Sequence, residues 1–410
     1  MNFNKIMKCS ASALILASAS TLALAKVPQV GDVIDASNVD QYTDYMIESA
    51  VELVKKGQVL KVTPTSEKGA LINPYYAELT EKNKGKARLL DEYGTVGLED
   101  GSPWPGGSPF PEPKSALEAM SNFQFTNIST ESDQWTSNDG PYRPVSRFYY
   151  INSDAKIYKT ALMAGGQVQM TSRTVIEPVP SIPGYEDEYL RRYLYFLEPY
   201  DVQGLVTLDI QFRDQSKLPE AYIYLPAFRR VRQVSAANRA DSVAGSELSQ
   251  SDLGGFSDPL GLWKYKILEK KEALVNVTGT RISIENPDNP TLINGYFPHE
   301  HRPVQLREVY IIEATPRYDT IYSKKILTLD AELFRLSDIG AYDLQGKLYK
   351  GIQQDWNMQK EPGPYNIAPW LLLYNFQTNG ATLLSNHGLK VNVPIDPAVF
   401  EKSNMKNFGR

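Results

Sequence analysis

Cysteine and histidine are nearly absent from this chain of 410 residues. Cys9 is its one cysteine, so the chain cannot form an internal disulfide, and the fold must depend on a buried core. A chain of this length can bury such a core easily. Zinc sites built mainly from thiolates are excluded for the same reason.

Sequence motifs of catalysis are also missing. His299 and His301 lie between Pro298 and Pro303, in a sequence typical of a solvated turn, and an H-x-H pair binds zinc only if a third ligand arrives. His387 has no serine in a G-x-S-x-G motif beside it. No glycine pair stands in a phosphate-binding motif. A triad or a carboxylate pair assembled in space stays open. We therefore predict no catalytic residue, no metal ion, no cofactor and no enzymatic activity.

Residues 1–25 are typical of a cleaved export signal. An apolar stretch over 9–24 ends in Ala23-Leu24-Ala25, which matches the A-x-A cleavage pattern. Lys8 precedes Cys9 where a lipoprotein signal needs a small residue, so we expect no lipid anchor. The sequence predicts cleavage near Ala25 and a mature protein in the periplasm, either free or peripheral to the outer membrane.

Charge and hydropathy narrow the class of protein further. Asp and Glu number 48 against 43 Lys and Arg, and a net charge of −5 argues against nucleic acid as a partner. No later stretch reaches 18 consecutive apolar residues, so the mature chain is predicted to have no transmembrane segment.

The region 26–125 is predicted to hold a helix, a strand and a proline-rich strap. Apolar residues form one helical stripe over 40–57 with Gly57 as its stop, and 59–63 is typical of a strand. The stripe consists of Tyr42, Met46, Ala50, Leu53 and Val54.

Dense proline over 103–113 blocks both helix and central strand. A surface linker would explain this segment, but Trp104 and Phe110 would be costly to leave in water. We therefore expect an ordered strap that packs these aromatic rings on a sheet. A helix is expected from Ser115, where Glu118 fits a capping box.

From about residue 143 the pattern changes to strands. They are expected over 146–151, 155–162, 168–176, 189–198, 204–213, 220–228, 263–269 and 307–315. Gly165-Gly166 and 343–346 are predicted to be turns between strands. No helical segments alternate with the strands, so a long antiparallel sheet is expected. The Ser-, Asn-, Asp- and Gly-rich segment 234–261 is expected to be the most mobile part.

Two of these strands are apolar on both faces. Over 189–197 and 221–228 one face is mainly aliphatic and the other aromatic, whereas a sheet with one solvated face alternates apolar with charged residues. The aromatic face includes Tyr193, Tyr195, Tyr222 and Tyr224. Two stacked sheets with a packed core would give this pattern. A sheet with helices on one side and a cavity on the other would also give it.

A family resemblance favours the cavity. It rests on segments 221–232, 245–253, 309–316, 322–330 and 342–350, in that order and spacing. These resemble the periplasmic lipoprotein-sorting proteins, the LolA/LolB-like half-barrels, and a larger uncharacterised periplasmic family related to them. The resemblance implies an α+β, mainly β fold, in which a long antiparallel curved sheet forms an incomplete barrel. Helices would lie on its concave side and an extended N-terminal strap outside. Residues 126–410 would form the half-barrel and a C-terminal extension, in one structural domain with 26–125.

The resemblance also implies a carrier of lipid or other hydrophobic molecules, serving an exporter or an outer-membrane channel. The expected ligand-binding residues are Tyr193, Tyr195, Tyr222, Tyr224, Arg230 and Arg232. The tyrosines would line an acyl-chain pocket and an arginine would meet an anionic head, although Arg229-Arg230-Val231-Arg232 also fits a plain solvated rim. An accessory subunit of an envelope transport complex and a carbohydrate-binding or hydrolytic protein remain alternatives.

Overall fold

The computed structural model describes residues 25–127, 132–134, 146–276, 292–297, 299–359, 365–367, 370–386, 390–392 and 394–408. Residues 1–24 of the predicted export signal and His387 lie outside these ranges. Within them, no helix is long and apolar enough to cross a membrane.

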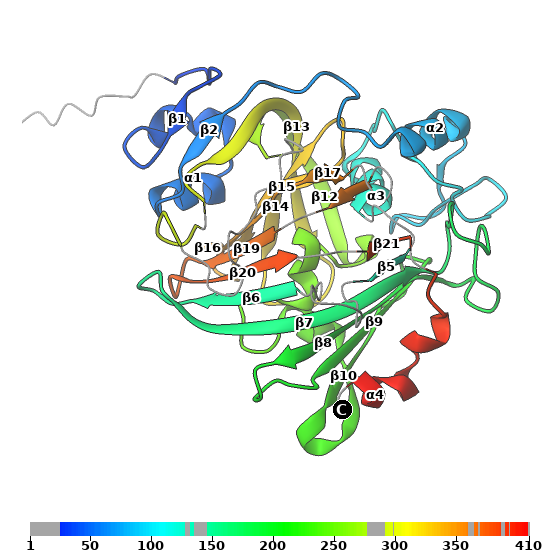
Figure 1. The fold of residues 1–410 in the computed structure, drawn as a ribbon. Coiled ribbons are helices and arrows are strands. Elements are labelled where there is room, and N and C mark those ends of the chain that lie inside the picture. Colours follow the sequence, from blue (N-terminus) through cyan, green and yellow to red (C-terminus); the bar gives the residue numbers. More distant parts are fainter. Residues whose placement is uncertain are drawn as a thin grey trace, which may run out of the picture.

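One long curved sheet dominates the molecule (Figure 1). Thirteen of its strands pair antiparallel in the order β11-β10-β9-β8-β7-β6-β20-β19-β16-β15-β14-β13-β12. Their bounds are β6 Ser146–Ile151, β7 Ile157–Gln169, β8 Glu188–Glu198, β9 Val206–Phe212, β10 Glu220–Leu225, β11 Arg230–Val234, β12 Trp263–Val275, β13 Arg302–Pro316, β14 Lys324–Asp330, β15 Leu336–Tyr342, β16 Leu348–Gln354, β19 Trp370–Asn375 and β20 Gly380–Asn386. The end strands β11 and β12 do not pair with each other among the described residues, so the sheet stays open. The predicted incomplete barrel is confirmed.

Short elements extend this sheet and cover it. The remaining strands are β1 Val33–Ile34, β2 Leu60–Val62, β3 Arg88–Leu89, β4 Val96–Gly97, β5 Ser132–Gln134, β17 Asn357–Gln359, β18 Tyr365–Ile367 and β21 Lys390–Val391. The α-helices are α1 Glu48–Lys55, α2 Pro74–Asn83, α3 Ala116–Asn127 and α4 Met405–Phe408. Because β2 runs parallel to β13, the sheet is mixed at that edge.

The two faces of the sheet bury different clusters. Along β19, Leu371 and Leu373 join the central core, whereas Leu372 and Tyr374 join a cluster on the opposite side. We call the face that meets the central core the inner face. Helix α3 packs on the inner face through Met120. Helix α1 instead packs on the outer face through Leu53, so the prediction that helices lie on the concave side holds for α3 and is wrong for α1.

Strand β7 corrects the predicted turn at Gly165-Gly166. The expected strands 155–162 and 168–176 are one strand, in which Gly165 pairs with Leu194 and Gly166 with Tyr193 of β8. Pairing with β8 holds both glycines extended, and Gly166 also pairs with Gln134 of β5 on the other side. The turn predicted at 343–346 is present between β15 and β16.

The helix predicted over 40–57 is shorter than expected. Two 3₁₀ turns, Val39–Gln41 and Thr43–Tyr45, precede α1, and Met46 is extended at φ −141° and ψ 152°. All five residues of the predicted apolar stripe are nevertheless buried. Gly57 ends the segment at φ +107°, a backbone conformation that side chains with a Cβ rarely adopt.

The proline-rich strap is ordered around Trp104, as predicted. This side chain is fully buried, and its Nε1 donates to the carbonyl of Gly107 at 2.8 Å. Its neighbours are Val96 of β4 and Phe125 of α3 rather than the long sheet. At the start of α3, Ser115 Oγ accepts from the amide of Glu118 at 3.2 Å, which is half of the expected capping box.

The segment predicted to be most mobile is instead packed inside the sheet. Residues 239–262, called the inner segment below, contribute Leu248, Phe256 and Leu262 to the central core. Its polar residues Arg239 and Asp252 are also buried. The prediction was wrong because small polar residues usually mark a solvated loop, whereas here they satisfy one another and the sheet in the interior.

Candidate functional site

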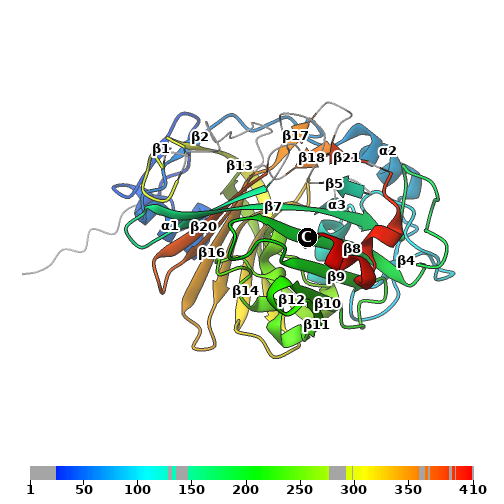
Figure 2. The ribbon, with the colours of Figure 1, turned by 60° about the horizontal axis from the view of Figure 1, so that its bottom comes forward.

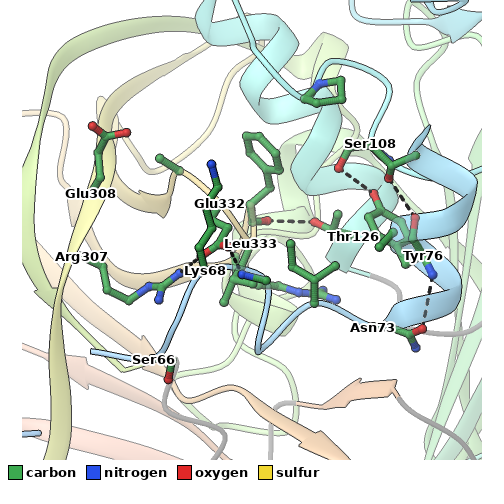
Figure 3. A pocket seen from close by; sticks show the side chains of 18 of the residues that line it. Ser66, Lys68, Asn73, Tyr76, Ser108, Thr126, Arg307, Glu308, Glu332 and Leu333 are labelled. Atoms are coloured by element: carbon green, nitrogen blue, oxygen red, sulfur yellow. Dashed lines mark hydrogen bonds and ion pairs between the residues drawn. The ribbon is translucent and has the colours of Figure 1, made fainter. Parts of the chain in front are cut away.

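A cavity of about 800 Å³ lies between the N-terminal region and the edge of the sheet. From here on, residues 65–113 of that region, which include the proline-rich segment, are called the strap. We call the cavity the strap pocket. Its walls come from residues 65–81 with α2, residues 108–112, α3, β12, β13 and the loop between β14 and β15. Tyr76 and Ser108 lie on one side of it, and Arg307 and Glu308 on the other (Figure 3).

Aliphatic and aromatic groups form much of the pocket wall. They are Ile72, Ala77, Pro111, Leu306, Ala331, Leu333 and Phe334. Leu333 and Phe334 belong to the tight β14–β15 loop, where Phe334 takes a left-handed φ of +50°. Thr126 of α3 donates to the carbonyl of Phe334 at 2.9 Å and so holds this strained residue in place.

Asp330 builds the β14–β15 loop. Its carboxylate accepts from the amides of Glu332 at 3.0 Å and Leu333 at 2.7 Å. The same carboxylate pairs with Arg307 of β13 at 2.5 Å, and Arg307 also reaches Glu332 at 2.7 Å. Glu332 in turn accepts from the amide of Gly69 at 2.5 Å. This chain of contacts fixes the strap to the sheet across the pocket.

Two hydroxyl groups meet on the strap side. Tyr76 Oη lies 3.2 Å from Ser108 Oγ, and the amide of Ser108 donates to Thr80 Oγ1 at 2.9 Å. Burial raises the pKa of Tyr76 well above its ordinary value, so this phenol keeps its proton.

Arg335 is the most unusual residue of the pocket. Its side chain is 4% exposed, and its Nε and Nη1 have no hydrogen-bond partner. The guanidinium stacks over the ring of Trp356 at 4.6 Å. Burial lowers its pKa to about 9, only partly offset by the nearby Tyr76. A buried cation is thus held beside a cavity with no described carboxylate paired to it.

Carboxylates surround the mouth of the pocket instead. Glu81, Glu112, Glu272 and Glu308 line it and are exposed. Lys68 is an exposed cation at the same rim. Charge therefore changes sign from the acidic rim to the basic interior.

The four predicted tyrosines lie together on the outer face of β8 and β10, and none of them lines the strap pocket. The C-terminal segment, residues 394–408, covers this face (Figures 1 and 2). Phe400 lies 4.8 Å from Tyr193 between ring centroids, and Lys402 Nζ donates to Tyr222 Oη at 3.0 Å.

The structure does not bring Arg230 and Arg232 to these tyrosines. Both are exposed on the edge strand β11, where Arg230 pairs with Leu225 and Arg232 with Ile223. Directly paired residues point to the same face of a sheet. The two arginines therefore point away from the face that carries Tyr222 and Tyr224.

The described histidines do not form a metal site. No group of three His, Cys, Asp or Glu side chains gathers in the described ranges. His299 is not the solvated residue that its sequence suggested, because its ring packs 5.5 Å from Trp370 and both nitrogens are enclosed without partners. Burial, together with Arg302 and His301, lowers its pKa to about 3.

Ion pairs fix the inner segment to the sheet. Asp252 meets Lys325 at 2.8 Å and Lys350 at 3.4 Å. Burial opposes ionisation of Asp252, but the two lysines outweigh it and hold its pKa below the usual range. A second network joins Arg239 to Asp209 of β9 at 2.6 Å and to Asp258 at 2.9 Å. These carboxylates are committed to structural partners rather than available to a ligand.

The comparisons with known proteins agree with this architecture. Residues 33–405 match the family described as "Protein of unknown function (DUF1329)". No curated protein matches the chain. A crystal structure from Vibrio parahaemolyticus, named for outer membrane lipoprotein sorting, has 19% identity and a TM-score of 0.50, covering 71% of this chain and 98% of its own.

Two further crystal structures are similar. A DUF1329 family protein from Desulfovibrio piger has 17% identity and a TM-score of 0.49, covering 70% of this chain and 96% of its own. A LolA superfamily protein from Nitrosomonas europaea has 12% identity and a TM-score of 0.44, covering 71% and 99%. At 19% identity, the Vibrio parahaemolyticus structure shows a shared fold alone.

Proposed function

The chain belongs to the DUF1329 family, and from this premise we propose that it is a periplasmic binding protein that carries lipid or another hydrophobic molecule. The similarity to a lipoprotein-sorting domain supports a fold suited to such cargo. The observation that carries the proposal is the strap pocket, a cavity of about 800 Å³ with an apolar wall. That volume lies within the usual range of small-molecule sites.

The energetics of an acyl chain fit this pocket. Each buried methylene contributes about 0.8 kcal/mol, so a chain of roughly ten methylenes supplies about 8 kcal/mol before ordering costs. After these costs, a dissociation constant no tighter than about 1 μM is expected for such a chain. Leu306 and Leu333 provide contact from the sheet and Ile72 from the strap.

One observation favours a second candidate, an accessory subunit of an envelope transport complex. The inner face, where a half-barrel carrier would hold its cargo, is filled by the inner segment. Buried ion pairs such as Asp252–Lys325 hold this segment in place. A filled interior suits a protein that contacts partners rather than ligand, unless the cargo binds in the strap pocket.

Filling the strap pocket tests the carrier function. Ala331 lines the cavity, so Ala331→Trp places an indole where the chain would lie. Wild-type protein should bind a fluorescent fatty acid saturably, and Ala331→Trp should weaken this binding about tenfold or more. Leu344→Trp is the matched control, because Leu344 is 67% exposed in the β15–β16 turn.

Urea unfolding of each variant shows whether it keeps the fold, and Ala77→Trp on α2 offers a second route if Ala331→Trp unfolds. Absence of saturable binding by the wild type would favour the accessory subunit. Equal binding by wild type and both pocket variants would place the ligand elsewhere.

A further inference from the structure

We propose that the strap pocket selects amphiphiles with an anionic head, a carboxylate or a phosphate monoester, and that Arg335 binds that head. This inference rests on the proposed function, because it assigns the polar end of the ligand that the apolar wall would hold. The inference goes beyond the proposed function because it names the chemical class of the cargo and the residue that recognises the head group.

Arg335 differs from every other buried arginine in the described ranges. Six others are buried: Arg173, Arg191, Arg192, Arg239, Arg302 and Arg307. Five of these pair with a carboxylate, and Arg173 donates to three backbone carbonyls. Among the buried arginines that the structure describes, Arg335 alone has a guanidinium that donates to no described protein oxygen.

An unpaired buried guanidinium is expensive. A buried cation normally needs a counter-charge or hydrogen-bond acceptors to offset the loss of hydration. The ring of Trp356 at 4.6 Å attracts the cation but accepts none of its in-plane N–H groups. The planar fork of these N–H groups matches ligands with two oxygens, which carboxylate and phosphate provide.

The hydroxyl pair opposite can supply a further donor. Tyr76 and Ser108 each carry one O–H, and the contact between them uses one of the two protons. The remaining proton has no acceptor among the described residues. Tyr76 is close enough to Arg335 to influence its pKa. An anionic oxygen between them would therefore accept from both a guanidinium and a hydroxyl.

The acidic rim does not cancel this attraction. Glu308 pairs with Lys270 at 2.7 Å, and Glu332 is committed to Arg307. Glu81, Glu112 and Glu272 are exposed, so water and salt screen them more strongly than they screen the buried Arg335. Such a rim disfavours large polyanions at the mouth and admits a single compact charge on an apolar chain.

Three ligands of equal chain length test the inference in calorimetric titrations of the whole chain: a fatty acid, an alkyl phosphate and an alcohol. Wild-type protein should bind the two anions about tenfold more tightly than the alcohol. Arg335→Met should weaken binding of both anions by about tenfold and change alcohol binding less than about twofold. Inorganic phosphate, added as a competitor, shows whether the anion alone binds at this position.

Arg88→Met is the matched control, since Arg88 of β3 is an exposed arginine outside the pocket, and its affinities should equal those of the wild type. Arg335→Lys keeps the positive charge but loses the planar guanidinium, so it should retain part of the preference for anions over the alcohol. This variant replaces Arg335→Met in the test if the methionine variant unfolds. If wild type binds all three ligands equally, the anionic selection is wrong and the carrier function stands. If none of them binds, the proposed function itself fails.

Discussion

Asp252 of the inner segment lies 2.8 Å from Lys325 of β14, and neither side chain is exposed to solvent. Tyr322 donates to the same carboxylate at 2.6 Å, and Ser249 at 2.7 Å. A carboxylate with this many partners compensates the buried lysine and fastens the inner segment to the sheet. The position of the whole segment therefore depends on a few internal charges.

Asp252→Asn should destabilise the protein by about 3 kcal/mol, because it leaves Lys325 and Lys350 buried without a counter-charge. Equilibrium urea unfolding measures the change. Glu52→Gln is the control, since Glu52 pairs with Lys55 on the exposed side of α1 and should cost less than about 1 kcal/mol. Equal costs for the two variants would contradict an anchoring role for Asp252.

His299 should make stability depend on pH. The pKa of His299 is about 3 in the folded chain and near 6.5 when unfolded. Between these two pH values the unfolded chain binds a proton at His299 and the folded chain does not. Stability from this group is therefore present above pH 6.5 and lost as pH falls toward 3, by roughly 2 kcal/mol at pH 5.

His299→Phe should remove this loss while it keeps the packing on Trp370. The measurement compares unfolding free energies at pH 7 and pH 5. His301→Phe should retain the wild-type dependence, because the His301 side chain is 33% exposed. A His299→Phe variant with unchanged pH dependence would show that the ring is hydrated in solution.

Gly107 should tolerate no side chain. A Cβ there would lie 2.6 Å from the Cα of Thr80 and 2.7 Å from the carbonyl carbon of Leu79, so backbone would have to move. Gly101 has the same left-handed φ, +83° against +82°, but open space around it.

Gly101→Ala therefore reports the cost of the backbone conformation, about 1 kcal/mol, and Gly107→Ala should cost at least about 1–3 kcal/mol more. Thermal unfolding measures both. Because Ser108 follows Gly107, the second variant should also weaken ligand binding in the strap pocket. Similar losses in both variants would mean that the strap shifts freely on α2.

Phe400→Ala should loosen the C-terminal segment. The ring is 1% exposed and packs on Tyr193, so its removal should cost about 3–5 kcal/mol if the segment stays docked. A smaller cost, together with faster proteolysis within 394–408, indicates that the segment detaches instead.

Detachment of the C-terminal segment in Phe400→Ala would also test whether the four tyrosines predicted from the sequence bind ligand. Tyr193, Tyr195, Tyr222 and Tyr224 remain a proposed ligand surface only with the C-terminal segment displaced. Fatty-acid binding that increases in Phe400→Ala would support this role, and unchanged binding would remove it.

Strand boundaries could be predicted where pattern and pairing agree. The expected strand 146–151 is β6, because alternating apolar side chains fit a sheet covered on both faces. Gly165-Gly166 was mistaken for a turn because local propensity does not reveal neighbouring strands on both sides. The helix predicted from residue 40 begins only at Glu48 for a similar reason, since local periodicity does not reveal that Met46 is extended in the folded chain.

The site was less accessible to sequence reasoning. Arg335 stands between Phe334 and Leu336, and a lone charge in an apolar stretch was a usable signal. Nothing in the sequence placed Trp356 under it or Tyr76 nearby. Likewise, the sequence around Asp252 is typical of a loop, and only the fold shows that Lys325 and Lys350 of distant strands lie beside it.

The parallel pairing of β2 with β13 constrains the order in which the chain folds. Thr63 donates to the carbonyl of Val304, 241 positions later in the sequence. Strand β6 likewise pairs with β20, which lies far along the sequence, and Ser146 is opposite Asn386. A chain that emerges from its N-terminus first must leave β2 without β13 until residue 304, and β6 without β20 until residue 386, and non-local pairing of this kind is slow. Protection of unpaired strands during synthesis is therefore a requirement of the topology itself.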